Sequence, residues 1–505
     1  MVFLACVIAC LAQVPAAPIN YCDSVVISQT RAALADLKTS LQVHQGKSGI
    51  TAVYQGTVSI EGHMMHPGDL RTVPVRLELT ADADGMSVRE ISGPDGKGAV
   101  ETTLINRGRV AEQSAQAAPF KETPPDNAPK AAADAAGWLP ATILQAALDA
   151  APSCRPGAAV DDHGQALSPV TFTDAAGGTC TVLMDAQHRV ARIESLSAHA
   201  RLGDVCNWTQ FGNWDQVDGA AVPRELSRFI VASAATIRYD LSLVSCKFGS
   251  VPEVTLPENR QTDIPTWGQT PAPELEYIQL SPTLWSVEVA ASNSRIMVIE
   301  REKDLVLLGA PDDDTVCGSL ITAFKARFAD KPIGLVSFSH HHPSPSGGLR
   351  ALAATGATIL APAALEPHIR GLLSRSTSLG SPAVAGPANP SIKTFEHETT
   401  IEAGDATVRL IDIAEKSAHA FSYVVFYFPE QGILVEDDLG FFPTEGAARV
   451  SPRLIGLVDA IETLHIEPKH VIQGWPVRNA RRDVDWSVVA DLVHAERDKK
   501  KPARN

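Results

Sequence analysis

Apolar and polar residues alternate over much of the first half of the chain, and this period of two predicts β-strands. A different pattern comes first, at 25–46, where apolar residues recur with the spacing of an amphipathic helix. The alternating runs that follow lie at 50–62, 72–82, 86–93, 179–198, 207–226 and 236–249. Within 179–198, the residues Asp185–His188 interrupt the apolar positions and predict a turn between two strands. We therefore expect a helix followed by a meander of antiparallel strands.

The second half alternates instead between short apolar runs and segments with helical spacing. A charged turn joins two β-rich runs at 292–311, and a helix is predicted at 317–328. The apolar strand 333–338 follows, and 356–373 has the pattern of a strand and then a helix. Such alternation is typical of a chain that winds between a sheet and the helices covering it.

The length and one proline-rich segment predict two domains. A chain of 505 residues exceeds what one hydrophobic core usually supports. The segment 251–274 contains five prolines, lacks a periodic apolar face, and is predicted to be the interdomain linker. It separates a β-rich domain at 23–250 from a second domain at 275–490, which a basic tail at 491–505 follows. The Ala- and Pro-rich stretch 112–137 is predicted to be an exposed insertion.

The clearest chemical signal is the stretch Ser339–Leu349, which reads SHHHPSPSGGL. In an extended segment His340 and His342 point to the same side, so both can reach one metal ion, while His341 faces away. Ser-Gly-Gly at 346–348 allows a tight turn and the start of a helix. Three histidines in a row are by themselves often only a loop tip, so the interpretation depends on the surrounding pattern.

This stretch resembles the metallo-β-lactamase superfamily motif His-x-His-x-Asp-His followed by Gly-Gly-Leu. His340 and His342 stand in its first two places. The sequence departs from the motif at Ser344, where the family has Asp, and at Pro345, where it has the next His. The resemblance continues over roughly 275–490 and implies an αββα sandwich for this half.

Further along, 413–439 is similar to the family's third-histidine segment, hairpin and bridging-aspartate turn. The match places His419 as the third histidine and Asp438 as the bridging carboxylate. Trp475 stands where the family has its last histidine.

The departures all fall on one of the family's two metal sites. Ser344, Pro345 and Trp475 replace the ligands of the second metal, whereas the three histidines of the first are kept. Proline and tryptophan side chains offer no lone pair to a metal, and a neutral serine hydroxyl is a poor zinc ligand. The resemblance therefore implies one zinc ion at a degenerate active site. Its implied ligands are His340, His342 and His419, with Asp438 beside them.

The leading hypothesis is hydrolysis of an ester, lactone or related bond in a small molecule. Three histidines with an open fourth position form a complete catalytic zinc set, which activates a water as nucleophile. The family's aspartate that orients this water is missing, so Asp438, Glu436 or Asp437 would have to take its role. The alternative is a catalytically inactive pseudo-hydrolase that binds a ligand or partner. Asp438 ends an apolar strand, so capping the next turn is an equally open role for it.

The first half has a weaker resemblance, to domains of the lipoprotein-carrier and lipoprotein-sorting type. It rests on the helix and meander and on the turn Trp-Asp-x-Val-Asp-Gly-x-x-Val-Pro at 214–223. The expected fold class is therefore α+β, with a curved antiparallel half-barrel and its helix before the αββα sandwich. A concave face would bind an acyl or other apolar group, and the alternative is that the apolar face only packs a core.

Charge argues against a nucleic acid or an anionic membrane surface as the main partner. The net charge is −15, from 43 basic and 58 acidic residues, and the only basic cluster is the tail. The hydrophobic share of 45% is that of ordinary globular domains. Histidines that are predicted to be plain surface residues are His63, His66, His188 and His341.

The beginning of the chain resembles a secretory signal peptide. Residues 2–12 are apolar and uncharged, and the small residues after them suit cleavage near Ala16, so a signal is predicted at 1–17. The run is too short for a stable membrane span. We expect export to the periplasm or the exterior and no integral span, with a lipoprotein-processing site at Cys10 as the alternative.

Export would leave an even number of cysteines, which permits disulfides. The remaining cysteines are Cys22, Cys154, Cys180, Cys206, Cys246 and Cys317. Because each pair lies within one β-rich segment, the predicted bonds are Cys154–Cys180 and Cys206–Cys246. Free buried thiols are the alternative.

Overall fold

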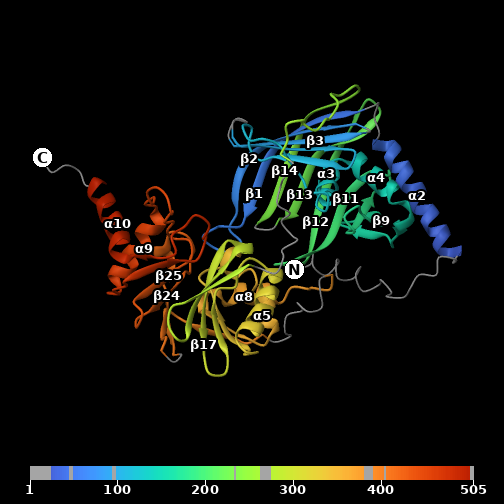
Figure 1. Ribbon diagram of the computed structural model, residues 1–505. Coiled ribbons are helices and arrows are strands. Elements are labelled where there is room, and N and C mark those ends of the chain that lie inside the picture. Colours follow the sequence, from blue (N-terminus) through green and yellow to red (C-terminus); the bar gives the residue numbers. More distant parts are fainter. Residues whose placement is uncertain are drawn as a thin grey trace.

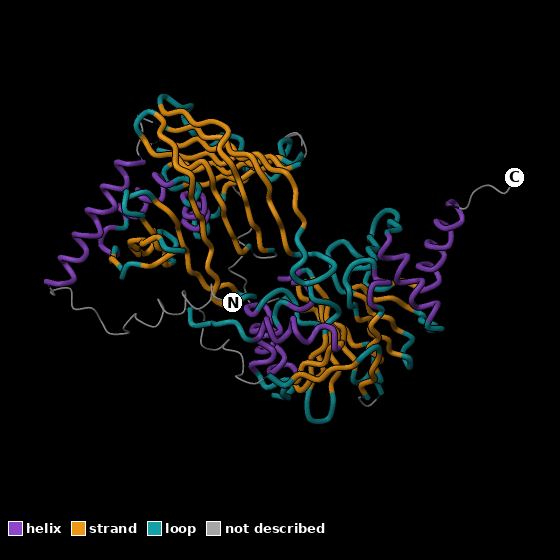
Figure 2. Tube along the Cα trace, turned by 180° about the vertical axis from the view of Figure 1, so that it is seen from behind, coloured by secondary structure: helices purple, strands orange, loops and turns teal. Residues whose placement is uncertain are grey.

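The computed structural model describes the chain in two parts, which Figures 1 and 2 show from opposite sides. The N-terminal part runs to residue 261 and the C-terminal part begins at 274. The described residues are 24–44, 49–82, 84–93, 98–232, 235–261, 274–379, 390–402 and 405–500. The predicted signal peptide, Cys22, residues 262–273 of the predicted linker and the end of the basic tail lie outside them.

One antiparallel sheet forms the N-terminal part. Its strands are β1 (Ile50–Glu61), β2 (Arg71–Ala81), β3 (Gly85–Ser92), β4 (Val100–Asn106), β5 (Arg109–Gln113), β6 (Lys121–Glu122), β7 (Arg155–Pro156), β8 (Val160–Asp162), β9 (Gln165–Thr173), β10 (Thr179–Met184), β11 (Val190–His199), β12 (Gly203–Val217), β13 (Ala220–Val231) and β14 (Thr236–Phe248). Their order is β6-β5-β4-β3-β2-β1-β14-β13-β12-β11-β10-β9-β7, with β8 paired to β9. The meander that the alternating pattern predicted is present, and β1 lies in its middle against β14.

Helices pack against this sheet and close its core. They are α2 (Ser24–His44), α3 (Ala128–Ala136) and α4 (Pro140–Asp149). Leu37 of α2 and Leu144 of α4 are fully buried in one cluster with Tyr54 and Leu77 of the strands. The apolar face of the sheet therefore packs a core, in agreement with the second of the two sequence alternatives.

The C-terminal part contains two further sheets. The first has the order β15-β16-β17-β18-β19-β20-β21 and the second β22-β23-β24-β25-β26-β27. The strands are β15 (Leu275–Gln279), β16 (Leu284–Val289), β17 (Ser294–Glu300), β18 (Leu305–Leu308), β19 (Ile333–Ser337), β20 (Thr358–Pro362), β21 (Ile392–Phe395), β22 (Glu398–Ile401), β23 (Val408–Asp412), β24 (Val424–Phe428), β25 (Ile433–Glu436), β26 (His470–Gln473) and β27 (Val484–Asp485). The helices are α5 (Asp314–Arg327), α6 (Pro343–Ser346), α7 (Leu349–Ala354), α8 (Glu366–Leu373), α9 (Pro452–Thr463) and α10 (Trp486–Lys500). Among the described helices, none is both long and apolar enough to cross a membrane.

Alternate residues of single strands enter different cores, which fixes four layers. On β24, Val425 packs with α9 and α10, whereas its neighbour Phe426 packs between the two sheets with Met297 of β17. The helices α5, α7 and α8 share a third core with the outer face of the first sheet. The order helix, sheet, sheet, helix is the αββα arrangement expected for this part, and Figure 2 shows helices on its outside.

The two parts meet where the turn between β11 and β12 lies against α5 and α7. Leu202 and Val205, from this turn and the start of β12, are buried in the same cluster as the residues of α5 and α7. The Ala200 carbonyl accepts a hydrogen bond from the Asp314 N–H at 3.2 Å. The Asp204 carboxylate accepts from the Ser376 hydroxyl at 2.7 Å, so apolar and polar contacts both hold the parts together.

Two segments predicted to be irregular instead take part in the N-terminal fold. The stretch 112–137 contains β6 and α3. Ala128 and Ala135 of α3 are buried, because alanine side chains are small enough for the helix to pack closely. Residues 251–261 run along the same sheet, with Val254 buried and the Gln261 N–H donating to the Phe120 carbonyl at 2.8 Å.

The predicted disulfides are wrong, since Cys154, Cys180, Cys206 and Cys246 are all free thiols. The sheet order gives the reason. Strand β9 lies between β7, which Cys154 directly precedes, and β10, which carries Cys180. Strand β13 lies between β12 and β14, which carry Cys206 and Cys246. Two strand spacings amount to roughly 9.5 Å, which is beyond the reach of a disulfide.

Candidate metal centre

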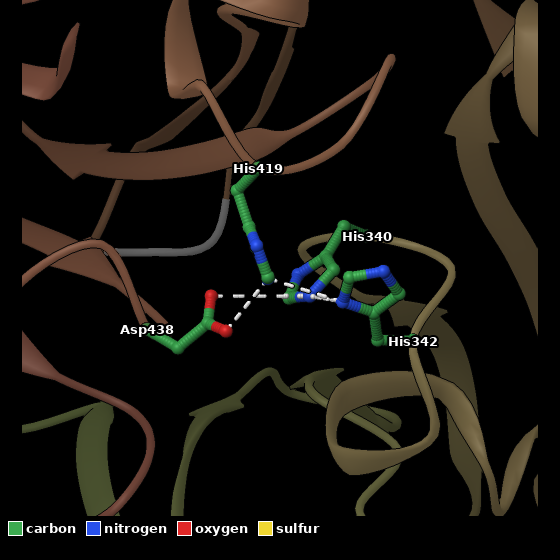
Figure 3. A group of neighbouring side chains, drawn as sticks. All are labelled: His340, His342, His419 and Asp438. Carbon is green, nitrogen blue, oxygen red and sulfur yellow. Dashed lines mark hydrogen bonds and ion pairs between the residues drawn. The ribbon is translucent and has the colours of Figure 1, made fainter. Parts of the chain in front are cut away.

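Four side chains from the two C-terminal sheets meet at one end of the sandwich (Figure 3). His340 and His342 follow β19 of the first sheet. His419 precedes β24 and Asp438 follows β25, both in the second sheet. The possible ligand atoms of all four residues lie within 4.8 Å of one another. The structure thus brings together the four residues that the family resemblance named.

The nitrogen atoms of the three histidines face a common point. His342 Nδ1 lies 3.0 Å from both His340 Nε2 and His419 Nε2. The carboxylate of Asp438 approaches the same point, with Oδ2 2.7 Å from His419 Nε2 and Oδ1 3.8 Å from His340 Nε2. The prediction that His340 and His342 point to the same side agrees with this geometry.

A hydrogen bond behind the His342 ring determines which of its nitrogens carries the proton. His342 Nε2 lies 2.9 Å from the Met64 carbonyl, which can only accept, so the proton of this ring is on Nε2. With its proton on Nε2, His342 keeps the lone pair of Nδ1 towards the common point. His340 Nδ1 lies 2.9 Å from Ser339 Oγ, which can both donate and accept, and 3.9 Å from Asp437 Oδ2.

Burial keeps these rings neutral. It lowers the pKa of His342 to about 4 and the pKa of His340 well below its ordinary value. At neutral pH the lone pair of His342 Nδ1 therefore lies 3.0 Å from both His340 Nε2 and His419 Nε2. Three imidazole nitrogens and a carboxylate oxygen are a donor set that zinc accepts, so the residues fit a zinc ion.

Asp438 is held in place from two sides. Its Oδ1 accepts from the Tyr423 hydroxyl at 3.2 Å, and its Oδ2 lies 3.2 Å from Arg453 Nη1. Burial by itself would raise the pKa of Asp438, but His340, His419 and Arg453 outweigh burial and lower it. Asp438 is thus a fixed, ionised carboxylate. The contacts of Tyr423 and Arg453 were not foreseen, because the family resemblance gave no role to Tyr423, which lies within 413–439, and did not include Arg453.

The two acidic neighbours of Asp438 lie elsewhere. Glu436 is fully enclosed and accepts from the Leu439 N–H at 2.6 Å. Asp437 lies behind His340, with Oδ2 3.9 Å from Nδ1, on the side away from the common point. Burial raises the pKa of both groups well above the ordinary range. Of the three carboxyls that the sequence offered, only Asp438 reaches the centre.

Two of the three positions of the missing second-metal ligands line a very small space. Ser344, Pro345 and the Gly474 backbone line a cavity of ≈ 20 Å³ together with Asp437 and Arg295. This is room for about one water molecule. Trp475 is held beside it by its N–H, which donates to the Asp437 carbonyl at 2.7 Å.

The histidines that were predicted to be surface residues behave differently from one another. His63 and His66 are exposed and His188 is half-buried. His341 is a correction, because it is 6% exposed. It also does not face away from His342, because the two ring centroids are 4.5 Å apart, and the rings of His368 and Phe421 lie next to it.

No family model matches the chain, and no curated protein matches it. Similar solved structures include a metallo-beta-lactamase from Pontibacter korlensis, with 17% identity over 44% of this chain and 98% of that chain, TM-score 0.33. The metallo-beta-lactamase FIM-1 from Pseudomonas aeruginosa in its mono-zinc form has 17% identity over 44% of this chain and 96% of that chain, with a TM-score of 0.31. The DIM-1 metallo-beta-lactamase has 12% identity over 44% of this chain and 99% of that chain, with a TM-score of 0.34.

Proposed function

We propose that this protein is a metal-dependent hydrolase with one zinc ion. His340 Nε2, His342 Nδ1 and His419 Nε2 would hold the ion, with Asp438 beside it. The observation that carries the proposal is the meeting of three imidazole nitrogens and one carboxylate within 4.8 Å. The proposed substrate is an ester, lactone or related bond of a small molecule.

Zinc in such a set of ligands polarises a carbonyl and lowers the pKa of water to about 7, which makes water a nucleophile at neutral pH. The residues of the chain supply orientation. Asp438, fixed by Tyr423 and Arg453, accepts a hydrogen bond from the attacking water and sets its direction. Because the pKa of Asp438 is lowered, the carboxylate keeps this role over the whole neutral range.

A second candidate function rests on the position of Asp438. Three histidines and one carboxylate already number four donors, and a four-coordinate zinc with only protein ligands is typical of a structural site. On this alternative the protein is an inactive pseudo-hydrolase whose metal centre stabilises a binding surface.

Measuring metal content, coordination and turnover together separates the two candidates. We expect about one zinc per chain, X-ray absorption that shows an exchangeable oxygen ligand besides the protein donors, and slow hydrolysis of esters or lactones. The variant His419→Ala should lose its zinc. His188→Ala, which removes a half-buried histidine of the N-terminal part, is its matched control. A protein that holds zinc with four protein donors and is inert towards esters, lactones, thioesters and β-lactams would establish the pseudo-hydrolase.

We also propose that the protein is exported. The apolar run at 2–12 and the small residues that follow it support this. Expression of the full chain in a Gram-negative host tests the proposal, since N-terminal sequencing of the periplasmic fraction should show cleavage near Ala16. Full-length chain confined to the cytoplasm would contradict it.

A further inference from the structure

A loop of the N-terminal part reaches the metal centre of the C-terminal part. The loop joins β1 to β2 and comprises Gly62–Leu70. In Figure 1 the blue end of β1 extends towards the orange and red segments that carry His419 and Asp438. This contact is separate from the one at the β11–β12 turn.

Two backbone carbonyls of the loop are engaged by the C-terminal part. The Met64 carbonyl accepts from His342 Nε2 at 2.9 Å, and the Met65 carbonyl accepts from the Phe421 N–H at 2.9 Å. Phe421 lies two residues after His419, so the loop is attached to the histidine segments of both sheets. Two consecutive carbonyls of the loop thus form specific hydrogen bonds with these two segments, beyond simple packing.

Two histidine rings of the loop add to these bonds. The His63 side chain is exposed, yet its ring meets His342 edge-on with 4.9 Å between centroids. The His66 ring stacks on Phe421 with 5.1 Å between centroids. The first ring therefore contacts the same histidine whose Nε2–H is bound by the Met64 carbonyl.

The Met64 contact has a direct consequence for the donor atoms. A histidine ligand is oriented by the group that accepts its other N–H, and loss of such a partner typically weakens metal affinity about 10–100-fold. With Nε2–H committed to the Met64 carbonyl, Nδ1 of His342 keeps its lone pair towards His340 and His419. Rotation of the ring or a change of tautomer would remove that lone pair from the common point.

We propose that the β1–β2 loop is a built-in part of the metal centre, in which the Met64 carbonyl is the positioning group for His342 and the N-terminal part thereby sets the affinity for metal. The proposal rests on the metal-binding role of His342 proposed above. It assigns to the N-terminal part a function in the C-terminal site.

The test is to shorten the loop in the full chain and to measure zinc binding by competition with a chelator. Replacing Gly62–Asp69 by Asn-Gly leaves the strand pair Ile60↔Arg71 intact and suits a two-residue hairpin turn. We expect zinc affinity to fall about 10–100-fold. The control is the hairpin between β9 and β10, with Asp174–Gly178 replaced by Asn-Gly, for which the affinity should not change.

A milder variant guards against misfolding of the shortened chain. Met64→Gly with Met65→Gly keeps both carbonyls but raises the conformational entropy of the undocked loop, so a smaller loss of affinity in the same direction is expected. Unchanged affinity in a folded loop-shortened variant, or in the glycine variant when the shortened chain does not fold, would overturn the proposal.

A metal-free readout keeps this test independent of the proposed hydrolase. Nitrogen-15 NMR of metal-free protein labelled at histidine reports the tautomer of each ring. The wild type should show His342 protonated at Nε2, and the loop-shortened variant should show a mixture of tautomers. A wild type that binds no zinc would refute the proposed hydrolase function. The tautomer of His342 would then be the remaining test of whether the Met64 carbonyl positions this ring. An unchanged tautomer in the variant would refute that role.

Discussion

Arg350 and Asp314 form a buried ion pair, with Arg350 Nη2 2.6 Å from Asp314 Oδ2, beside the Ala200 carbonyl of the N-terminal part. The side chains are 1% and 5% exposed, so neither charge is screened by water. Burial raises the pKa of Asp314 to about 6, although Arg350 opposes the shift. Both residues belong to the C-terminal part, and the pair contacts the N-terminal part through the Ala200 carbonyl, which accepts from the Asp314 N–H and from Arg350 Nη2.

Breaking this pair should be far more harmful than replacing it. Asp314→Asn leaves the Arg350 guanidinium buried without a counter-charge, and we expect the free energy of unfolding to fall by about 3–5 kcal/mol. The double variant Asp314→Leu/Arg350→Met should recover most of this loss, because no buried charge remains. Urea denaturation of the three proteins measures both effects, and a double variant as unstable as Asp314→Asn would contradict the account.

Stability of the N-terminal part should depend on His44. Its Nδ1 lies 2.8 Å from the Ala221 carbonyl, and its Nε2 accepts from the Val190 N–H at 3.1 Å, so only the neutral ring satisfies both partners. Burial lowers the pKa of His44 to about 4, while the unfolded chain titrates at its ordinary value of 6.5. The folded state then binds fewer protons than the unfolded state between these values, and stability is lost as pH falls from 6.5 to 4.

The size of this effect follows from the shift, at about 1.4 kcal/mol per unit of pKa, or about 3 kcal/mol in all. His44→Gln offers an amide that can donate and accept without titrating. Between pH 7 and pH 4 the wild type should therefore lose about 3 kcal/mol more than this variant. Equal losses in chemical denaturation at the two pH values would show that His44 is not the titrating group.

Zinc content should depend on single histidines of the centre. His419→Ala removes one of three imidazole donors, and we expect the protein to lose its zinc during purification. Elemental analysis measures this, with His494→Ala as a second control, since His494 lies on α10 and pairs with Glu462 instead. Retention of a full equivalent by His419→Ala would mean that other residues hold the metal.

The second metal site should be recoverable. Ser344→Asp, Pro345→His and Trp475→His together restore three ligand side chains around the small cavity next to Asp437. We expect metal content to rise from about one to about two ions per chain and ester hydrolysis to increase, since a second cation shares the developing negative charge. The single variant Trp475→His should stay near one ion.

Elements with a clear period were predictable from the sequence. The helix expected at 25–46 is present as α2, and the strands expected around the turn at Asp185–His188 are β10 and β11. Short-range spacing was enough here because each element depends on residues close to it in the chain. The orientation of His340 and His342 followed from the same rule.

What failed were features set by distant contacts. The strand order β12-β13-β14 separates Cys206 from Cys246, and no local pattern reveals which strands are neighbours. His341 was assigned to the surface because the packing of α8 against it cannot be read from residues 339–349. The loop at Gly62–Leu70 carries no signal of its own, since its contact with His342 is made by a backbone carbonyl.

The pairing of β1 with β14 has a consequence for how the protein is made. Ile50 lies opposite Phe248, so the central seam of the N-terminal sheet joins strands that are synthesised far apart in time. At ribosomal rates of about 5–20 residues per second, β14 is synthesised roughly 10–40 s after β1. Until then, β2 is the one neighbouring strand with which β1 can pair. Contacts of such long sequence separation form slowly. During synthesis, β1 and β2 are therefore the segment that most needs protection by a chaperone.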